Sequence, residues 1–354
     1  MIQGKNVLVV GTGLIGTSIA LGLTAQGLDV FLSDIDPTAL DDALKVSGAT
    51  KYTNQDILLV VVATPPVSTA KVIAAATKDH PLAVVTDVAS VKASIFRELE
   101  QIGTTAWDRI VGGHPMAGRE VSGAIGAQGN LFLDRPWVIA RSDRTSADAV
   151  ATVQELVESL GAFPVFRTID EHDRAVALIS HTPQVIASVL AGELMDAEGS
   201  YIELAGQGIR DTIRIAGSDS ELWTEILSEN SEYISQQVTA VANHLLEFVG
   251  ALEAGNRESV NARLIKGNQG KDRLPGKHGS SQQSTAILAV RLDDKPGELA
   301  RLFTAAAQSN VNLEDVRIDH SLGHPTGLVE LTVTPISIEI LKPALAAQGF
   351  VVIS

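Results

Sequence analysis

Three short segments of the chain combine titratable or hydroxyl side chains with glycine or proline, as active-site loops often do. Residues 87–92 read Asp-Val-Ala-Ser-Val-Lys, and residues 112–118 read Gly-Gly-His-Pro-Met-Ala-Gly. The third segment contains Arg210 and Arg214, which share one face if the segment is helical. Two adjacent guanidinium groups repel each other unless an anion lies between them. Together the segments indicate acid–base chemistry on an anionic substrate.

His114 is the leading candidate for a catalytic base, and we expect it to lie in a rigid turn between glycines and a proline. The ordinary pKa of imidazole lies near neutral pH, as general-base catalysis requires. Ser90 is expected to orient the substrate hydroxyl or His114 itself. As an alternative or additional role, Ser90 would be the N-cap of a helix over residues 92–99.

A glycine-rich turn predicts a dinucleotide site. Residues 11–16 read Gly-Thr-Gly-Leu-Ile-Gly, after an expected strand and before an expected helix. In this context the three glycines permit a tight turn, a close approach of pyrophosphate, and close helix–strand packing. Asp34 would bind the ribose hydroxyls and repel a 2′-phosphate, although Asp36 is near enough to take this role. We expect NAD rather than NADP, bound by Gly11, Gly13, Leu14, Ile15, Gly16 and Asp34.

The first half of the chain alternates strand and helix patterns, and these elements must position the site. Continuous aliphatic runs predict strands buried on both faces, at residues 6–10, 30–33, 57–62, 83–86, 137–140 and 163–166. Helical patterns occur between them, for example at 14–26 and 66–78. This alternation predicts a Rossmann-like α/β domain, a doubly wound parallel sheet, over residues 1–167.

Residues 168–265 have a different pattern, because strand signals stop and apolar residues recur at helical spacing. A helix start is expected at Thr182 and Pro183. We expect an all-α substrate-binding and dimerisation domain, because so small and apolar a helical block often buries one face against a second copy. A homodimer is therefore expected.

The remainder of the chain is divided into a linker and a small domain. Residues 266–283 are rich in Gly, Ser, Gln and Lys, which predicts a flexible linker. Residues 284–354 predict a ferredoxin-like βαββαβ domain. Its strands are expected at 286–292, 313–320, 327–333 and 350–353, and its helices at 297–309 and 336–348.

In combination, these motifs resemble the prephenate/arogenate dehydrogenase family, which makes the precursor of tyrosine. The resemblance covers residues 5 to about 265. Besides the glycine turn with Asp34 and the segment 87–92, it is carried by His114-Pro-Met-Ala-Gly118, Glu120, Ser122-Gly123, Ser180-His181-Thr182-Pro183, Arg210-Asp-Thr-Ile-Arg214 and Trp223. Residues 293–299 resemble the opening of an ACT domain, a regulatory module that often binds amino acids.

The resemblance implies NAD-dependent oxidative decarboxylation of prephenate to 4-hydroxyphenylpyruvate. Arogenate, which would give tyrosine directly, is the alternative substrate. His114 would accept the proton of the ring hydroxyl as hydride leaves, and Arg214 would bind the ring carboxylate through its planar fork. Arg210 would lie in the same pocket, His181 toward the substrate side chain, and Arg119 against the side-chain carboxylate.

The ACT-like segment implies allosteric feedback by an aromatic amino acid, tyrosine or phenylalanine. Gly297 and Asn310 occupy the turn and helix end where related modules place effectors.

Composition narrows the remaining classes of function. A net charge of −15 disfavours nucleic acid as a partner. The absence of cysteine excludes disulfides and thiolate ligands and fits a cytoplasmic protein. The longest aliphatic run, residues 57–63, is too short to cross a membrane, so no membrane partner is expected. No spacing typical of metal ligands is found, and no metal is expected.

Two further functions remain open at this point. A hydroxyacid dehydrogenase would use a catalytic lysine, and Lys92 is the only lysine near the carboxyl edge of the expected sheet. A non-catalytic nucleotide and amino-acid sensor would use the same domains without turnover. Asp87 and Glu120 are either loop anchors or ligands, and Trp223 is expected to be structural. The other histidines have no neighbouring residues that suggest a catalytic or ligand role, and we expect them to be surface or core residues. They are His80, His172, His244, His278, His320 and His324.

Overall fold

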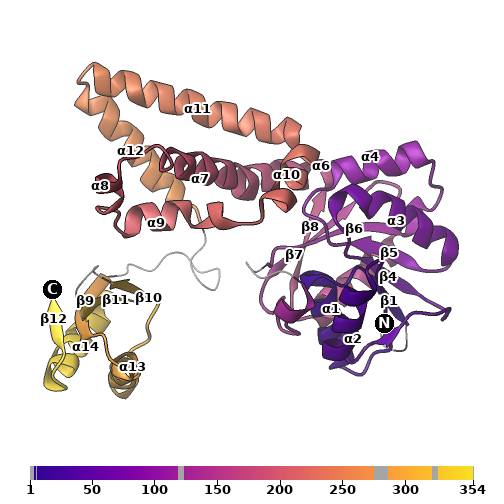
Figure 1. Cartoon of the computed structure of the whole chain (residues 1–354), viewed down its shortest axis with the longest axis horizontal. Helices are drawn as coiled ribbons and strands as arrows, with labels where there is room; N and C mark the ends of the chain where they lie inside the picture. Colours follow the sequence, from indigo (N-terminus) through magenta and orange to yellow (C-terminus); the bar gives the residue numbers. More distant parts are fainter. Residues whose placement is uncertain (1–3, 5, 119–122, 275–285, 321–325, 354) are drawn as a thin grey trace. The chain divides into compact units, whose positions relative to one another are not determined.

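The computed structural model describes residues 4, 6–118, 123–274, 286–320 and 326–353. These residues form two compact units, 1–243 and 244–354, which are considered separately (Figure 1). The first unit contains an α/β domain and a set of helices that follows it. The second unit contains a helical hairpin segment and a small α/β domain.

An eight-stranded sheet forms the centre of the first unit, in the order β3-β2-β1-β4-β5-β6-β7-β8. Its strands are β1 Val7–Val10, β2 Val30–Ser33, β3 Thr50–Lys51, β4 Leu59–Val62, β5 Val84–Asp87, β6 Ile110–Pro115, β7 Pro136–Arg141 and β8 Phe163–Thr168. The Rossmann-like sheet is confirmed, but it is not wholly parallel, because β6 and β7 pair antiparallel. The described part of their connection contains only a 3₁₀ turn, Ala124–Gly126, whereas a parallel return requires a longer crossover.

Helices cover both faces of this sheet, which explains the continuous aliphatic strands. Within β1, Val7 and Val9 belong to one apolar core and Leu8 to the other. Ile19 of α1 packs in the first core, and Ile73 of α3 packs in the second. The helices of this domain are α1 Leu14–Thr24, α2 Pro37–Ser47, α3 Pro66–Asp79, α4 Ala93–Ile102 and α5 Ala147–Ser159.

A continuous helical run follows β8 and carries several of the predicted site residues. It consists of α6 Ile169–Val176, a π-helical segment Ala177–His181, and α7 Thr182–Glu193. Thr182 is thus not the start of a separate helix. It marks the point where this continuous helical run changes from π to α geometry. Pro183 explains the change, because proline has no N–H and its ring conflicts with the carbonyl four residues before it.

The same run is long and apolar enough, by length and composition, to cross a membrane. One third of its most apolar window is nevertheless buried, and it also buries His172, Asp173 and His181 inside the protein. These buried polar residues identify it as a core helix of the fold. The helices after it are α8 Gly199–Ile202, α9 Gln207–Ile213, α10 Ser220–Glu229, α11 Ser231–Glu253 and α12 Arg257–Lys271, with a 3₁₀ turn at Arg214–Gly217.

The C-terminal domain has the predicted βαββαβ order and an antiparallel sheet in the order β10-β11-β9-β12. Val290, Leu302 and Leu341 are among its fully buried core residues. Its elements are β9 Ala286–Asp293, α13 Glu298–Gln308, β10 Asp315–His320, β11 Thr326–Val333, α14 Pro335–Ala347 and β12 Val351–Ile353. The linker prediction was wrong at its start, because residues 266–271 are the last turns of α12, and residues 275–283 lie outside the described residues.

Candidate active site

The glycine turn between β1 and α1 has the geometry of a dinucleotide cradle. Gly11 has a φ of +100°, and a β-carbon there would lie 2.4 Å from the carbonyl oxygen of Ala63. A β-carbon on Gly16 would lie 2.0 Å from the carbonyl oxygen of Gly11. A β-carbon on Gly13 would meet nothing within 4 Å, and no side chain caps α1. Open space at an uncapped helix N-terminus suits a pyrophosphate.

Asp34 follows β2 and faces this turn. Its Oδ2 accepts hydrogen bonds from the backbone N–H of Thr12 at 2.6 Å and from the Thr12 hydroxyl at 2.7 Å. Partial burial raises the pKa of Asp34, but the bonds from Asp36 and Thr12 outweigh it and lower the pKa overall. Asp36 already has a structural role, because its carboxylate caps α2 at Thr38. The half-buried Leu14 and Ile15 form the first turn of α1.

A buried ion pair lies at the carboxyl end of β5. Lys92 Nζ lies 2.7 Å from both carboxylate oxygens of Asp87, and both side chains are completely buried. Burial raises the pKa of Asp87, and the charge of Lys92 opposes this change. A lysine held in this way cannot serve as the catalytic lysine of a hydroxyacid dehydrogenase. Asp87 is therefore an anchor of the site.

Two glycines let strand β6 pass close to this pair. A β-carbon on Gly112 would lie 2.9 Å from Lys92 Cδ, and one on Gly113 would lie 2.3 Å from the backbone oxygen of Asp87. His114 follows them on β6, opposite Val138 of β7. The predicted turn at His114 was therefore wrong, because its backbone pairs with a neighbouring strand.

His114 makes a contact that the sequence did not predict. Its Nδ1 lies 2.8 Å from Nε2 of His172, and Nδ1 of His172 lies 2.7 Å from Oδ1 of Asp173. His172 is 1% exposed, so the prediction that it lacks supporting neighbours was wrong. The usable signal was the adjacent His-Asp pair, which precedes Ser180-His181 by two helical turns. The pKa of His114 lies well below its ordinary value. Burial is the largest cause, followed by the neighbouring groups His172, Lys92 and His181.

Asp173 also connects the helical segment to the α/β domain. Its carboxylate accepts hydrogen bonds from the backbone N–H groups of Lys92 at 2.9 Å and Ala93 at 2.7 Å, where α4 begins. Ser90 is therefore not the N-cap of α4. It lies half-buried in the β5–α4 loop, and among the described residues none pairs with its hydroxyl. Its role toward His114 stays a prediction.

His181 is buried beside this network. The side-chain amide of Asn230 lies 3.1 Å from His181 Nδ1 and donates to the backbone oxygen of Asp173 at 3.0 Å. The half-buried ring of Trp223 packs edge-on against the imidazole. Burial lowers the pKa of His181 to about 4, so it is neutral at physiological pH.

The two predicted arginines lie on the surface of the helical segment. Arg210 is in α9, and Arg214 begins the 3₁₀ turn that packs against α7, the helix that follows His181. Both are exposed. Arg119 and Glu120 lie outside the described residues. Because α9 ends at Ile213, Arg210 lies in α-helical geometry and Arg214 in the 3₁₀ turn that follows it.

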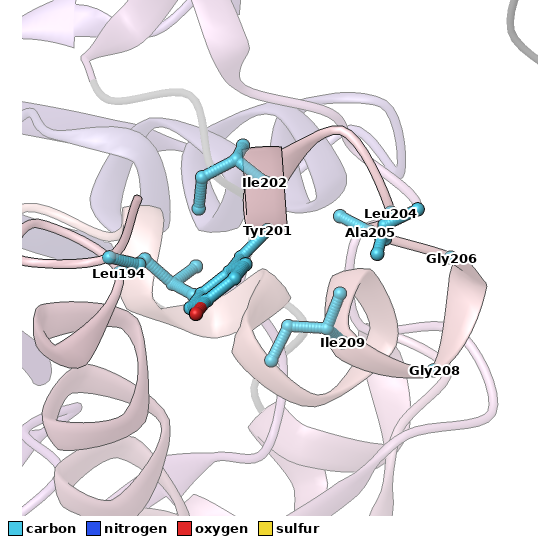
Figure 2. Close-up of a pocket in the computed structure, with 9 residues that line it drawn as sticks. Leu194, Tyr201, Ile202, Leu204, Ala205, Gly206, Gly208 and Ile209 are labelled. Atoms are coloured by element: carbon cyan, nitrogen blue, oxygen red, sulfur yellow. The ribbon is translucent and has the colours of Figure 1, made fainter. Parts of the chain in front are cut away.

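A pocket of about 480 Å³ lies elsewhere, among α7, α8 and α9. Figure 2 shows Leu194, Tyr201 and Ile209 directed into it. No titratable group other than the Tyr201 phenol lines it, so it cannot carry out general-base chemistry near neutral pH. Its apolar lining suits burial against another protein surface.

The predicted effector residues lie in the C-terminal domain. Gly297 precedes α13 with a φ of +94°, and Asn310 follows the helix with a φ of +53°. An 11-residue helix separates them by about 16 Å. One amino-acid ligand therefore cannot contact both residues within one copy of this domain.

Comparison with known proteins identifies the family. A model of the prephenate dehydrogenase nucleotide-binding domain matches residues 19–165, and a model of the prephenate dehydrogenase dimerization domain matches residues 168–266. The chain is also 34% identical to the probable prephenate dehydrogenase NovF of Streptomyces niveus, over 94% of both chains. The chain belongs to the prephenate dehydrogenase family. It is therefore an NAD-dependent dehydrogenase with a dimerisation domain.

Further members of the prephenate dehydrogenase family share this architecture. The prephenate dehydrogenase of Bacillus subtilis is 26% identical over 92% of this chain and 91% of its own. The crystal structure of Synechocystis arogenate dehydrogenase matches with a TM-score of 0.66 and 27% identity, covering 76% of this chain and 99% of its own. The Aquifex aeolicus prephenate dehydrogenase, solved with hydroxyphenyl propionate and NAD+, shares the fold with a TM-score of 0.69 at 24% identity, covering 75% and 97%.

Proposed function

We propose that this chain catalyses the NAD-dependent oxidative decarboxylation of prephenate to 4-hydroxyphenylpyruvate in tyrosine biosynthesis. One observation carries the proposal. β1 and β6 both end at the carboxyl edge of the sheet, so the Gly11 turn and His114 lie at the same edge. A half-buried, neutral imidazole is thus available at the same sheet edge as a dinucleotide cradle. This combination suits the oxidation of an alcohol.

The cofactor residues are Gly11, Gly13, Leu14, Ile15, Gly16 and Asp34. NAD supplies the oxidation of the substrate alcohol when it is bound in this cradle. Asp34 binds the ribose hydroxyls, and its negative charge repels the 2′-phosphate of NADP. The two bonds from Thr12 support this role, because they hold the carboxylate in one orientation.

His114 is the base in the proposed reaction. Its Nε2 accepts the proton of the ring hydroxyl as that carbon is oxidised. The C–C bond to the ring carboxylate then breaks, CO₂ leaves, and the electron pair makes the ring aromatic. His114 returns the proton to the resulting phenolate oxygen, so the proton count balances. Ser90 orients the hydroxyl during these steps.

Cationic and polar groups of the helical domain, together with Arg119 of the nucleotide-binding domain, bind the rest of the substrate. Arg214 binds the ring carboxylate and Arg210 lies nearer the periphery of the pocket. His181 contacts the side-chain end and Arg119 the side-chain carboxylate. A neutral His181, with its pKa of about 4, acts as a hydrogen-bonding group and not as a cation.

Arogenate is the second candidate substrate, favoured by the likeness to the Synechocystis arogenate dehydrogenase. The two substrates differ only in the side chain, which has a keto group in prephenate and an ammonium group in arogenate. Initial rates of NAD reduction with each purified substrate separate the two functions. A failure to reduce NAD with either would contradict both and favour a non-catalytic sensor.

A homodimer is part of the proposal, and the apolar surface of the helical domain supports it. Leu204, which lines the pocket of Figure 2, is 83% exposed, and Met195, which follows the lining residue Leu194 in the chain, is 85% exposed. Contiguous exposed apolar surface of this kind marks a protein interface. The proposed domains are residues 1–167, 168–265 and 284–354, and α12 continues the helical domain to Lys271.

The βαββαβ domain is proposed to be an ACT domain that binds tyrosine or phenylalanine as a feedback effector. Its topology supports this assignment. Because Gly297 and Asn310 lie at opposite ends of α13, an effector that uses both must lie between two copies of the domain. The absence of cysteine supports a cytoplasmic location.

A further inference from the structure

A hydrogen-bonded chain runs from a buried carboxylate to the proposed base. It joins Asp173 to His172 at 2.7 Å and His172 to His114 at 2.8 Å. We infer that His172 is a positioning residue, which keeps the proton of neutral His114 on Nδ1 and leaves Nε2 as the basic nitrogen. This inference rests on the proposed function, in which His114 is the base.

The direction of the hydrogen bonds follows from Asp173. Its Oδ1 accepts from the backbone N–H of Lys92, and its Oδ2 accepts from that of Ala93. A carboxylate whose oxygens accept from backbone donors is an acceptor toward its other neighbours as well. Nδ1 of His172 must therefore carry a proton and donate it to Oδ1.

The remaining proton positions are then fixed. Burial lowers the pKa of His172, so its ring is neutral and carries one proton only. Since this proton is on Nδ1, Nε2 of His172 has a lone pair and accepts a hydrogen bond from Nδ1 of His114. His114 is also neutral, so its Nε2 carries no proton. This nitrogen can accept the proton of the substrate hydroxyl.

The charges around the two rings favour this arrangement. Lys92 contributes a fixed positive charge that is balanced by Asp87, and His181 contributes a neutral ring held by Asn230. Both the positive charge and the burial disfavour a resting imidazolium at His114. When His114 accepts a proton during turnover, Nδ1–H still donates to His172, and the carboxylate of Asp173 stabilises the charge through that ring.

A purely structural role for His172 would not need this geometry. Asp173 caps α4 and receives the Asn230 bond through its own atoms, and neither contact involves the imidazole of His172. The ring contributes only the connection between Asp173 and His114. An unconstrained imidazole can adopt either tautomer, and the wrong tautomer of a catalytic histidine costs a large factor in rate.

Two substitutions at position 172 separate the two hydrogen bonds of the ring. His172→Asn keeps a donor near Nδ1 for Asp173 but removes the acceptor for His114. His172→Gln places an amide oxygen near the former Nε2 and so keeps an acceptor for His114. His80→Asn is the matched control, because His80 is 8% exposed in the same domain but packs against Tyr52, away from the network.

The experiment reads the tautomer by ¹⁵N-detected two-bond correlation spectra of the full-length protein at neutral pH, with His114→Gln used to assign the His114 signals. We expect the Nδ1–H tautomer in the unmodified protein, in His80→Asn and in His172→Gln. We expect the Nε2–H tautomer or a mixture in His172→Asn. With prephenate and NAD, His172→Asn should lower kcat about 10- to 10³-fold with an unchanged KM, and His172→Gln should restore most of the loss.

An Nε2–H tautomer of His114 in the unmodified protein would overturn the inference, as would full kcat in His172→Asn. The spectra require no substrate, so a chain that turns over neither prephenate nor arogenate contradicts the proposed function without touching the tautomer result. If His172→Asn does not fold, the inference is still tested, because the spectra of the unmodified protein and of His172→Gln report the tautomer of His114.

Discussion

The backbone N–H of Gly113 donates a hydrogen bond to the buried carboxylate of Asp87 at 2.8 Å. This bond fixes strand β6 against the end of β5, one residue before His114. The same carboxylate is paired with Lys92, so a single ion pair positions the strand that carries the proposed base. The stability of the pair and the geometry of the site are therefore linked.

Replacing Lys92 by methionine should destabilise the folded protein by about 3–5 kcal/mol, because it leaves the Asp87 carboxylate buried without its partner. Urea unfolding measures this loss. The control is Lys71→Met, which removes an exposed partner of Glu98 and should change the free energy of unfolding little. The double variant Lys92→Met with Asp87→Asn should regain much of the stability, because it removes the buried charge and keeps an amide oxygen as acceptor for the Gly113 N–H. Unchanged stability in Lys92→Met alone would contradict the role of the pair.

His114→Ala should lower kcat by about 10²- to 10⁴-fold, the range for loss of a positioned base. Binding of NAD, followed by protein fluorescence or calorimetry, should be retained because the glycine cradle is untouched. Full turnover by this variant between about pH 6 and 9 would show that His114 is not the base.

Arg214→Ala should mainly raise KM for prephenate, because it removes a bidentate partner of the ring carboxylate. Steady-state kinetics with saturating NAD measure the effect. The exposed Arg257 of α12 offers a control, since Arg257→Ala removes the same charge far along the chain from the site. Equal effects of the two substitutions would point to net charge and not to a specific contact.

Asp34→Ser should increase the use of NADP relative to NAD, because the carboxylate that repels a 2′-phosphate is removed. The ratio of kcat/KM for the two cofactors is the measurement. Asp36→Ser keeps an N-cap acceptor for α2 and should leave the cofactor preference unchanged. If Asp36→Ser changes the cofactor preference and Asp34→Ser does not, Asp36 and not Asp34 binds the ribose.

Stability should fall as the solution is acidified, because three histidines of the site have lowered pKa values. The folded-state pKa of His181 is about 4, below its ordinary value of 6.5, so the unfolded chain binds more protons between these values. The contribution of His181 is fully present above about pH 6.5 and is lost as pH falls toward about 4. His114 and His172 change in the same direction. Unfolding free energies at several pH values should fall less steeply in His181→Gln, and an identical slope would contradict this account.

Local patterns predicted most of the elements because they depend on short-range chemistry. The strand at Val30–Ser33 was predicted at its exact bounds, and α1 was predicted from its first residue. The glycine turn was equally accessible, since the tight turn at Gly11 and the open side of Gly13 are local requirements. The same motifs indicate the family from the sequence alone.

The features that were missed depend on contacts between distant segments. His114 was expected in a turn, because its glycines resemble loop residues, whereas they are required by the packing of β6 on Lys92 and Asp87. His172 lies 58 residues from His114, and its only local signal, the adjacent Asp173, does not indicate which residue the imidazole contacts. The cap of α4 comes from Asp173, 80 residues away from Ala93, so the sequence near the helix start offered only Ser90 as an alternative cap.

The cap that Asp173 provides for α4 also constrains motion. The helical segment cannot swing away from the α/β domain at this point without leaving two backbone donors unsatisfied. If the helical segment moves relative to the α/β domain, these two hydrogen bonds hold it at Asp173. The parts of the helices farther from Asp173 then move the most.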